Sequence, residues 1–379
     1  MSAIPKIKGW CPGAWRPMMS GDGLVVRIRP HLNRLTRDQG LRLADLAKSF
    51  GSGIIDLTSR ANLQIRGVST DRHQGLIAEL SDAGLLDPGP ELEARRNIIC
   101  APFWQAGDLT DRLHTALMTR LPELPLLPAK MGIAIDVAET RSLSAAPADF
   151  RLERSLDGSL VLRADGASQG VAVTEADAPD ALLELANWFV RSGGADAGRM
   201  KKHLTNSELP GQFRGTDPAP DGPLPEPGQR GTFALFGAAF GAIDAAVLHD
   251  LLRTSGPTGL RTTPWRLFAL ENTVIPEQTP FISAPGDPAL RVSACPGAPF
   301  CTQAQVATRA LARKLAPALA PGQSLHVSGC AKGCAHPAPA DITVAGAMGA
   351  FDLVRNGTAW DEPHRRGLSE DDILKEVAQ

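Results

Sequence analysis

Four cysteines near the C-terminus form two close pairs whose spacing suits an iron–sulfur cluster. Cys295 and Cys301 enclose five residues, and Cys330 and Cys334 enclose three. Four thiolates are the ligands that a [4Fe–4S] cluster requires. The surrounding sequence is rich in glycine, which lets backbone N–H groups approach sulfur because it has no side chain. The pattern therefore predicts a protein that transfers electrons.

Three other interpretations of the four cysteines remain open. Structural zinc sites also use four cysteines, but usually in pairs that enclose two to four residues, whereas Cys295 and Cys301 enclose five. Two disulfides require an oxidising compartment, and nothing in the sequence indicates export. Unrelated buried cysteines are the third interpretation, because free cysteine packs as a small hydrophobic side chain. Residues 302–319 favour the cluster, since they predict a helix that places Cys301 near its N-terminus, where the helix dipole favours a thiolate.

Basic residues gather in segments that we expect to be loops. A single arginine is usually a solvated surface charge. Arg60, however, lies between apolar residues, and Arg96 shortly precedes the apolar run Ile98–Cys100. An arginine in such a place usually has a carboxylate or phosphate partner, because an unpaired buried charge is costly. The group as a whole predicts a site for a polycarboxylate, and its members are Arg16, Arg27, Arg29, Arg60, Arg66, Arg95, Arg96 and Lys130.

The chain repeats one order of elements. Residues 23–68 predict a strand, a helix at 36–50 with Thr36 as its N-cap, and two short strands around Arg60. Residues 231–270 repeat this order. A strand–helix–strand unit with further strands suggests a small α+β sandwich, and we expect the two copies to share one sheet around a pseudo-dyad.

The segments that follow each unit also correspond. Residues 94–103 resemble residues 289–300, which places Cys100 opposite Cys295. Only the second copy carries the four cysteines of the two pairs. A ligand held between the copies would be contacted by both, since clefts at domain interfaces are favoured binding sites.

Composition and motifs exclude several classes of function. The net charge of −2 gives no global basic field for nucleic acid, and we expect no nucleic-acid partner. The most apolar stretch, residues 233–252, is interrupted by Asp244, His249 and Asp250, so we expect no membrane span. The N-terminus lacks the apolar region of a signal peptide, which predicts a cytoplasmic protein. No dinucleotide fingerprint or Walker A sequence occurs, so we expect an external electron donor or reductase.

The same segments resemble the sulfite/nitrite reductase superfamily. The spacing Cys-x5-Cys…Cys-x3-Cys is the cluster pattern of that superfamily, and TSRANLQIRG resembles its Thr-Thr-Arg-Gln-x-(aromatic or Leu)-Gln-x-(Arg/His)-Gly segment. RRNIIC resembles its Arg-Asn-(apolar) segment, and LPAK its Leu-Pro-x-Lys segment. Within the superfamily, CPGAWRPMMSGDGLVVRIRP, LPAKMG, SGCAKGCAHP and FDLVRNG are similar to the precorrin-3B synthase family.

The resemblance implies an α+β fold: a pseudo-two-fold repeat of ferredoxin-like half-domains plus two larger α/β domains that bind the cluster and the tetrapyrrole. The implied division is half-domain 1 with an N-terminal arm at 1–80, a tetrapyrrole-binding domain without cluster cysteines at 81–214, a linker at 215–230, half-domain 2 at 231–285 and the [4Fe–4S] domain at 286–379.

The resemblance also implies roles for single residues. The cluster ligands are Cys295, Cys301, Cys330 and Cys334, of which the last also bridges to sirohaem iron in the reductases. The catalytic and anion-binding residues are Arg60, Arg96 and Lys130, and Arg66 matches a tetrapyrrole-contacting position. Two positions depart from the reductases: Gly132 replaces their second lysine, and Ala61 replaces a glutamine.

The implied activity is a monooxygenase that converts precorrin-3A to precorrin-3B in cobalamin biosynthesis. It hydroxylates C20 and closes a γ-lactone with the ring A acetate. One atom of O2 enters the product and the other leaves as water, which requires two electrons, formally from NADH. The resemblance also implies a mononuclear non-haem iron. Such iron often takes two histidines and one carboxylate, but the spacing of the eight histidines identifies no such triad.

Two further functions compete. A sirohaem/[4Fe–4S]-dependent sulfite or nitrite reductase would use the same four cysteines. Gly132 argues against it, because six-electron sulfite reduction consumes many protons and needs dense positive charge around the anion. A binding module stabilised by zinc on the four cysteines is the third, non-enzymatic hypothesis.

Overall fold

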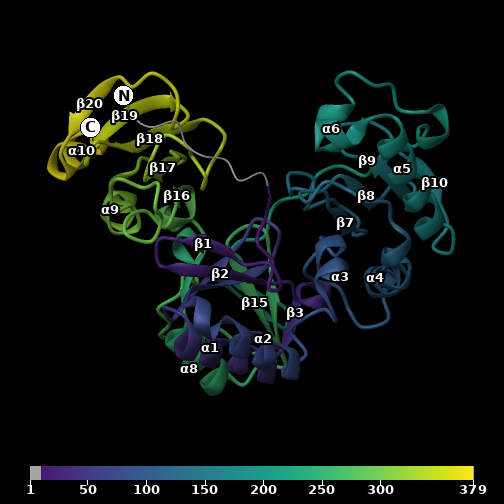
Figure 1. Cartoon of the computed structure of the whole chain (residues 1–379), viewed down its shortest axis with the longest axis horizontal. Helices are drawn as coiled ribbons and strands as arrows, with labels where there is room; N and C mark the ends of the chain where they lie inside the picture. Colours follow the sequence, from purple (N-terminus) through teal and green to yellow (C-terminus); the bar gives the residue numbers. More distant parts are fainter. Residues whose placement is uncertain (1–9, 379) are drawn as a thin grey trace.

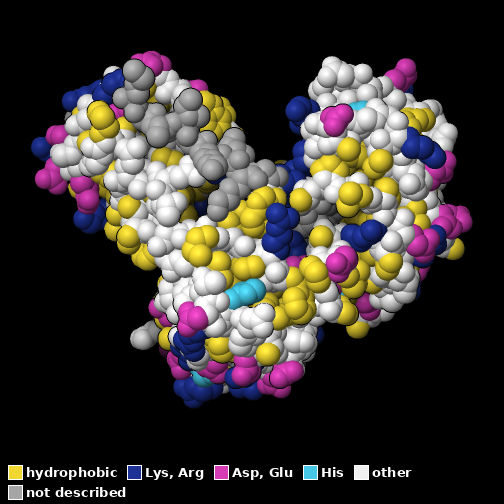
Figure 2. Space-filling model, in the orientation of Figure 1, with side chains coloured by type: hydrophobic (Ala, Val, Ile, Leu, Met, Phe, Trp, Pro, Cys, Tyr) yellow, Lys and Arg dark blue, Asp and Glu magenta, His cyan; other side chains and the backbone are white. Residues whose placement is uncertain are grey.

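The computed structural model describes residues 10–378, which form three lobes (Figure 1). The space-filling view shows a notch between the two upper lobes (Figure 2). The lower lobe in this view carries α1, α2 and α8 on its outer side, and the two upper lobes hold the remaining sheets. Each lobe has its own cluster of buried apolar side chains. Within the described residues, no helix is long and apolar enough to cross a membrane.

Two antiparallel five-stranded sheets form the lower lobe, one for each copy of the repeat. The first has the order β1-β2-β5-β4-β13, and the second β11-β12-β15-β14-β3. The bounds are β1 Met18–Ser20, β2 Gly23–Ile28, β3 Arg34–Thr36, β4 Ile54–Leu57, β5 Leu63–Val68, β11 Gly228–Arg230, β12 Phe233–Gly237, β13 Ala242–Asp244, β14 Gly259–Thr262 and β15 Leu267–Glu271.

The two copies exchange their edge strands. Ile243 of β13 pairs with Ile55 in the first sheet, and Leu35 of β3 pairs with Leu260 in the second. The prediction that the two copies share a single sheet is therefore wrong. The reason lies in the 3-10 turn before each exchanged strand, where Leu32 (φ 54°) and Phe240 (φ 62°) adopt left-handed backbone conformations that turn the chain toward the other sheet.

The helices of the lower lobe pack against each other across the pseudo-dyad. The predicted helix at 36–50 is confirmed as α1, Arg37–Phe50, and Thr36 forms a capping box with Gln39. Gly40 of α1 faces Leu252 of α8, Ala245–Ser255, so closely that a Cβ atom at Gly40 would lie 2.9 Å from the Leu252 Cδ1 atom. The buried side chains of α1, α8 and both sheets form one apolar core, so the half-domains fold as a pair. The helix α2 spans His73–Asp82.

The two upper lobes have the same sheet topology. In each, the first three strands are parallel and the last two antiparallel. The strands are β6 Ile98–Cys100, β7 Ile133–Asp136, β8 Phe150–Arg154, β9 Leu160–Ala164 and β10 Val171–Val173 in one lobe, and β16 Val292–Ala294, β17 Leu325–Ser328, β18 Ala340–Ala347, β19 Ala350–Gly357 and β20 Arg365–Leu368 in the other. The helices are α3 Pro90–Arg95, α4 Leu109–Arg120, α5 Ala178–Arg191, α6 Gly194–Ala197 and α7 Met200–His203 in the first, and α9 Arg309–Leu315 and α10 Glu370–Val377 in the second.

The prediction that a helix begins directly after Cys301 is wrong. The helix α9 begins at Arg309, and the residues between adopt turns and irregular backbone. Their backbone groups bond across to neighbouring loops: Gln305 N–H donates to the Gly329 carbonyl, and the Val306 carbonyl accepts from Ala298 N–H. Cys301 therefore lies on a loop and gains no stabilisation from a helix dipole.

The predicted linker lies along the surface of the lobe that contains β6–β10. Single bridges join Thr216 to Gly170 and Pro218 to Ser155 before the chain enters β11. The five-part division of the chain stays a prediction.

Candidate functional site

The four cysteines of the two pairs line one cavity of about 240 Å³. Cys295 directly follows β16, and Cys330 is the second residue after β17. Because these strands are parallel and adjacent, their carboxyl ends bring the two cysteine loops together. The opposite wall comes from the first half-domain and includes Met18, Gln64 and Arg66. Residues far apart in the sequence are thus joined at one site between two lobes.

Backbone and hydroxyl groups fix the cysteine loops. The Gly329 N–H donates to the Cys295 Sγ atom at 3.2 Å, as the glycines in this segment predicted. The Ser328 hydroxyl donates to the Cys330 carbonyl at 2.7 Å. Gly333 adopts φ 64°, and a Cβ atom there would lie 2.8 Å from the Trp360 ring. A side chain at this position is excluded both by the backbone conformation and by the ring.

The thiols lie close enough to affect one another's protonation. Burial raises the pKa of Cys330 and of Cys334, and the neighbouring Cys295 and Cys301 sulfurs raise both further. Thiols placed in this way hold their protons unless a positive centre replaces them. Four thiols around one cavity, with an N–H group directed at one sulfur, fit a [4Fe–4S] cluster, whose ligands bind different iron atoms. Among residues 10–378, no three Cys, His, Asp or Glu side chains form a site for a single metal ion.

Arg66 lies in the cavity wall, but carboxylates and carbonyls already occupy its guanidinium. Its Nε and one terminal nitrogen donate to Asp22 at 3.0 and 2.9 Å, and the same terminal nitrogen donates to the Phe300 carbonyl at 3.0 Å. The other terminal nitrogen is 3.5 Å from Asp56. Asp56 also accepts from Arg309, which lies in the lobe that carries the four cysteines. Through these hydrogen bonds, Arg66 connects the first half-domain to the loop that precedes Cys301.

Arg96 is likewise engaged. Its guanidinium donates to both Asp87 carboxylate oxygens, at 2.7 and 2.9 Å, and to the Arg29 carbonyl at 2.6 Å. The neighbouring Arg29 pairs with Glu93 at 3.1 Å, and burial lowers the Arg29 pKa to about 10. These ion pairs hold the segment before β6 against the end of β2, and they leave Arg96 less free for a ligand than the sequence predicted.

Arg60 and Lys130 lie together, as the sequence predicted. One terminal nitrogen of Arg60 donates to the Lys130 carbonyl at 2.8 Å, and the buried Arg60 Nε has no hydrogen-bond partner among the described residues. Burial lowers the Arg60 pKa, which marks a poorly solvated cation. The Lys130 side chain is exposed. A desolvated guanidinium with a spare donor is suited to an anionic ligand.

Sequence reasoning missed a third cation, Arg199, which lies just before α7. Its Nε donates to Asp149 at 2.8 Å, and about a third of its side chain is exposed. It also lowers the Arg60 pKa, so the two guanidinium groups are close. Asp149 is fully buried and accepts from the Gly132 N–H at 3.0 Å. Nothing in the sequence around Arg199 marks it, because only the fold carries it to Asp149.

Gly132 has little room for a larger residue. A Cβ atom there would lie 3.0 Å from the Asn97 carbonyl oxygen. Arg199 lies near this position, because its guanidinium and the Gly132 N–H both donate to Asp149. Figure 2 shows Lys and Arg side chains gathered at the floor of the notch between the two upper lobes. The notch therefore has a basic floor despite the small net charge of the chain.

Comparison with known proteins agrees with this arrangement. Residues 16–83 match the nitrite/sulfite reductase ferredoxin-like half domain. Precorrin-3B synthase of Sinorhizobium sp is 31% identical over an alignment that covers 93% of this chain and 83% of the relative. The chain belongs to the precorrin-3B synthase family.

Two further proteins are similar to this precorrin-3B synthase family member. Ferredoxin–nitrite reductase of Synechococcus elongatus is 29% identical, but the alignment covers only 40% of this chain and 32% of the relative. The Mycobacterium tuberculosis NirA protein shares the fold, with a TM-score of 0.66 and 19% identity over 94% of this chain and 79% of NirA. The predicted family and the α+β fold class are confirmed.

Proposed function

We propose that this protein is the monooxygenase that converts precorrin-3A to precorrin-3B. The observation that carries the proposal is the 31% identity to a precorrin-3B synthase over nearly the whole chain. One oxygen atom of O2 becomes the C20 hydroxyl group, and the ring A acetate closes the γ-lactone. The other oxygen atom leaves as water, with two electrons and two protons that NADH and solvent formally provide.

The basic floor of the notch supports binding of a tetrapyrrole with many carboxylates. Arg60 and Lys130 are two members of the group predicted from the sequence, and Arg199, from the lobe that also carries Lys130, adds a further cation. Because the Arg60 Nε is buried and has no hydrogen-bond partner among residues 10–378, a substrate carboxylate that reaches it would pair with this donor. We propose that Arg60, Lys130 and Arg199 hold substrate carboxylates, while Arg66 and Arg96 position the segments around them.

The cysteine cavity supports the second part of the proposal. Cys295, Cys301, Cys330 and Cys334 would hold a [4Fe–4S] cluster, which supplies electrons one at a time. The donor to that cluster is a separate protein, because the sequence carries no dinucleotide fingerprint. Within the described residues, no ligands for a mononuclear non-haem iron can be assigned. We propose that the protein acts in the cytoplasm, where reduced cysteines are maintained.

One experiment tests the activity directly. Anaerobically purified protein is incubated with precorrin-3A, a chemical reductant and isotopically labelled O2, and the product is analysed by mass spectrometry. We expect one labelled oxygen atom per product molecule and iron with acid-labile sulfide in the protein. Unlabelled product, or no product from iron-loaded protein, contradicts the proposal.

A sirohaem-dependent reductase is the second candidate, favoured by the partial likeness to ferredoxin–nitrite reductase. Arg199 restores part of the positive charge that Gly132 removes, so the charge argument against this candidate is weaker than the sequence indicated. Pigment extraction decides between the two. Extractable sirohaem together with nitrite or sulfite turnover would establish the reductase, and iron and sulfide without sirohaem support the synthase.

A further inference from the structure

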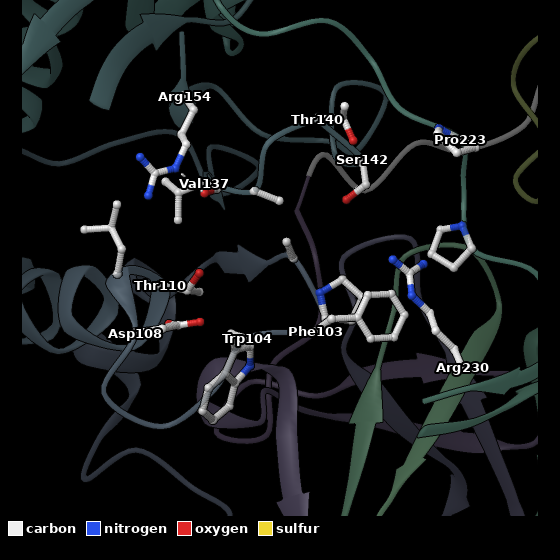
Figure 3. A pocket seen from close by; sticks show the side chains of 15 residues that line it. Phe103, Trp104, Asp108, Thr110, Val137, Thr140, Ser142, Arg154, Pro223 and Arg230 are labelled. Carbon is white, nitrogen blue, oxygen red and sulfur yellow. Dashed lines mark hydrogen bonds between the residues drawn. The ribbon is translucent and has the colours of Figure 1, made fainter. Parts of the chain in front are cut away.

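The lobe that contains β6–β10 has a second cavity, of about 270 Å³, at the carboxyl ends of β6 and β7 (Figure 3). Figure 3 shows Phe103 and Trp104 along one side, Arg154 and Ser142 along the other, and Arg230 at one end. The side chains come from the β6–β10 lobe, from the linker and from β11. No step of the proposed oxygenation uses this cavity.

The internal repeat relates this cavity to the cysteine cavity. Ala101 directly follows β6, as Cys295 follows β16, and each is followed by a proline. The counterpart of Cys295 is therefore Ala101, and the sequence prediction that it is Cys100 is wrong, because Cys100 is the last residue of its strand. Ala138 is the second residue after β7, as Cys330 is the second after β17. Each of these residues lines its own cavity. The two cavities are thus counterparts about the pseudo-dyad.

The correspondence extends along both loops. Ser142 is the sixth residue after β7, as Cys334 is the sixth after β17. In the cysteine loop, the Ser328 hydroxyl bonds to the Cys330 carbonyl. In the other, the Asp136 carboxylate accepts the N–H groups of Ser142 and the next residue, so the last residue of the strand closes the loop in both. The two loops therefore have corresponding geometry, but no cysteine lines this second cavity among the described residues.

The cavity presents positive charge without a matching anion. Arg230 lies 4.2 Å over the Phe103 ring, and its guanidinium forms no ion pair with any residue between 10 and 378. Arg154 donates to the Val137 carbonyl at 2.8 Å and makes no ion pair within the same range. The carboxylate in the wall, Asp108, accepts from two backbone N–H groups at 2.8 and 3.0 Å at the start of α4. The available polar groups therefore favour a ligand with negative charge.

The remaining wall combines apolar side chains with hydroxyl groups. Phe103, Trp104, Val137 and two prolines of the linker form its apolar part, and Thr110 and Thr140 supply the hydroxyl groups. The volume of about 270 Å³ lies just below the range of roughly 300–1,000 Å³ that is typical of pockets for drug-sized ligands, so it favours a small ligand. We propose that this cavity binds a small free carboxylate with a flat apolar body, which stacks on the aromatic wall while Arg230 pairs with its carboxylate.

Isothermal titration calorimetry of the full-length protein with benzoate tests the proposal, with acetate and inorganic phosphate as comparison ligands. We expect benzoate to bind with a dissociation constant of about 1 mM or tighter, and the comparison ligands about tenfold more weakly. Arg230→Ala should weaken benzoate binding about tenfold, because it removes the carboxylate partner. Arg253→Ala is the matched control, since Arg253 is an exposed arginine on α8, and it should bind like the wild type.

Three outcomes would overturn the proposal: no benzoate binding at millimolar concentration, equal affinity for phosphate, or an Arg230→Ala variant with unchanged affinity. Ser142→Phe gives a second test, because its ring would fill the cavity and should abolish binding. If that variant does not fold, Arg230→Ala still decides, because Arg230 is exposed and lies on an edge strand. The measurement requires no turnover, so its result is independent of the proposed oxygenation.

Discussion

Cys334 is the residue at which the proposed electron transfer can be tested most directly. It is the most exposed of the four clustered cysteines. Cys334→Ser should lose the visible absorbance of the cluster and abolish turnover, because a hydroxyl group is a poor ligand for iron–sulfur clusters. Tetrapyrrole binding, followed by fluorescence or absorbance titration, should persist, since the cations of the notch are unchanged.

Cys100→Ala is the matched control, because Cys100 lies at the end of β6 in the corresponding lobe. Burial raises the Cys100 pKa, so this thiol stays protonated and packs as an apolar side chain. We expect normal iron content and a small loss of melting temperature. Full activity of Cys334→Ser would refute the role of the cluster in turnover.

Arg199 provides a second test at the scale of one residue. Arg199→Ala should raise the KM for precorrin-3A about tenfold with a smaller effect on kcat, because it removes a cation from binding and not from the reacting atoms. Arg199→Lys keeps the charge and should restore most of the affinity. Lys201→Ala, in the same short helix α7, is the control for a general loss of surface charge. An unchanged KM in folded Arg199→Ala would remove this residue from the site.

The residues that the sequence identified and those that it missed differ in a physical way. The four cysteines lie on two short loops, so their spacing alone indicated a common site. Arg60 stood out because apolar residues flank it. Arg66 and Arg96 were given ligand roles, but each pairs with an aspartate that no local pattern connects to it. Arg199 had no local signal, since its relation to Arg60 exists only after two lobes have come together.

At the scale of elements, the close packing of α1 against α8 depends on Gly40. A valine there would bring its Cβ atom to about 2.9 Å from the Leu252 side chain, so Gly40→Val should destabilise the protein by about 1 to 3 kcal/mol. Chemical denaturation followed by circular dichroism measures this change. Leu252→Ala removes the clashing atoms, so the double variant should be more stable than the sum of the two single effects predicts. Strict additivity would show that Gly40 does not determine the distance between the helices.

Sequence patterns predicted elements well where local chemistry sets them. Thr36 and Gln39 form a capping box, which is why the start of α1 could be read directly. The segment after Cys301 has helical periodicity, yet hydrogen bonds to the Gly329 loop hold it open. Local patterns also could not predict which sheet β3 and β13 join, because both sheets can accept an edge strand and only the fold decides between them.

At the scale of the whole molecule, the pseudo-dyad explains why one chain forms two different cavities at corresponding positions of its two upper lobes. The half-domains share a core and exchange strands, so they act as a common base for both upper lobes. Each upper lobe then presents its strand ends to an edge strand of that base, β1 for the cysteine cavity and β11 for the other.

The exchanged strands predict that the two halves stay together when the chain is cut. A protease site introduced at the exposed Glu226, between the halves, should yield two fragments that elute as one complex and unfold in a single transition. The reason is that β3 completes the sheet of the second half and β13 that of the first, so separation exposes two sheet edges and the shared core. Size-exclusion chromatography and thermal unfolding measure this, with the uncut variant as control. Fragments that separate as folded monomers would show that each half is stable without the other's strand.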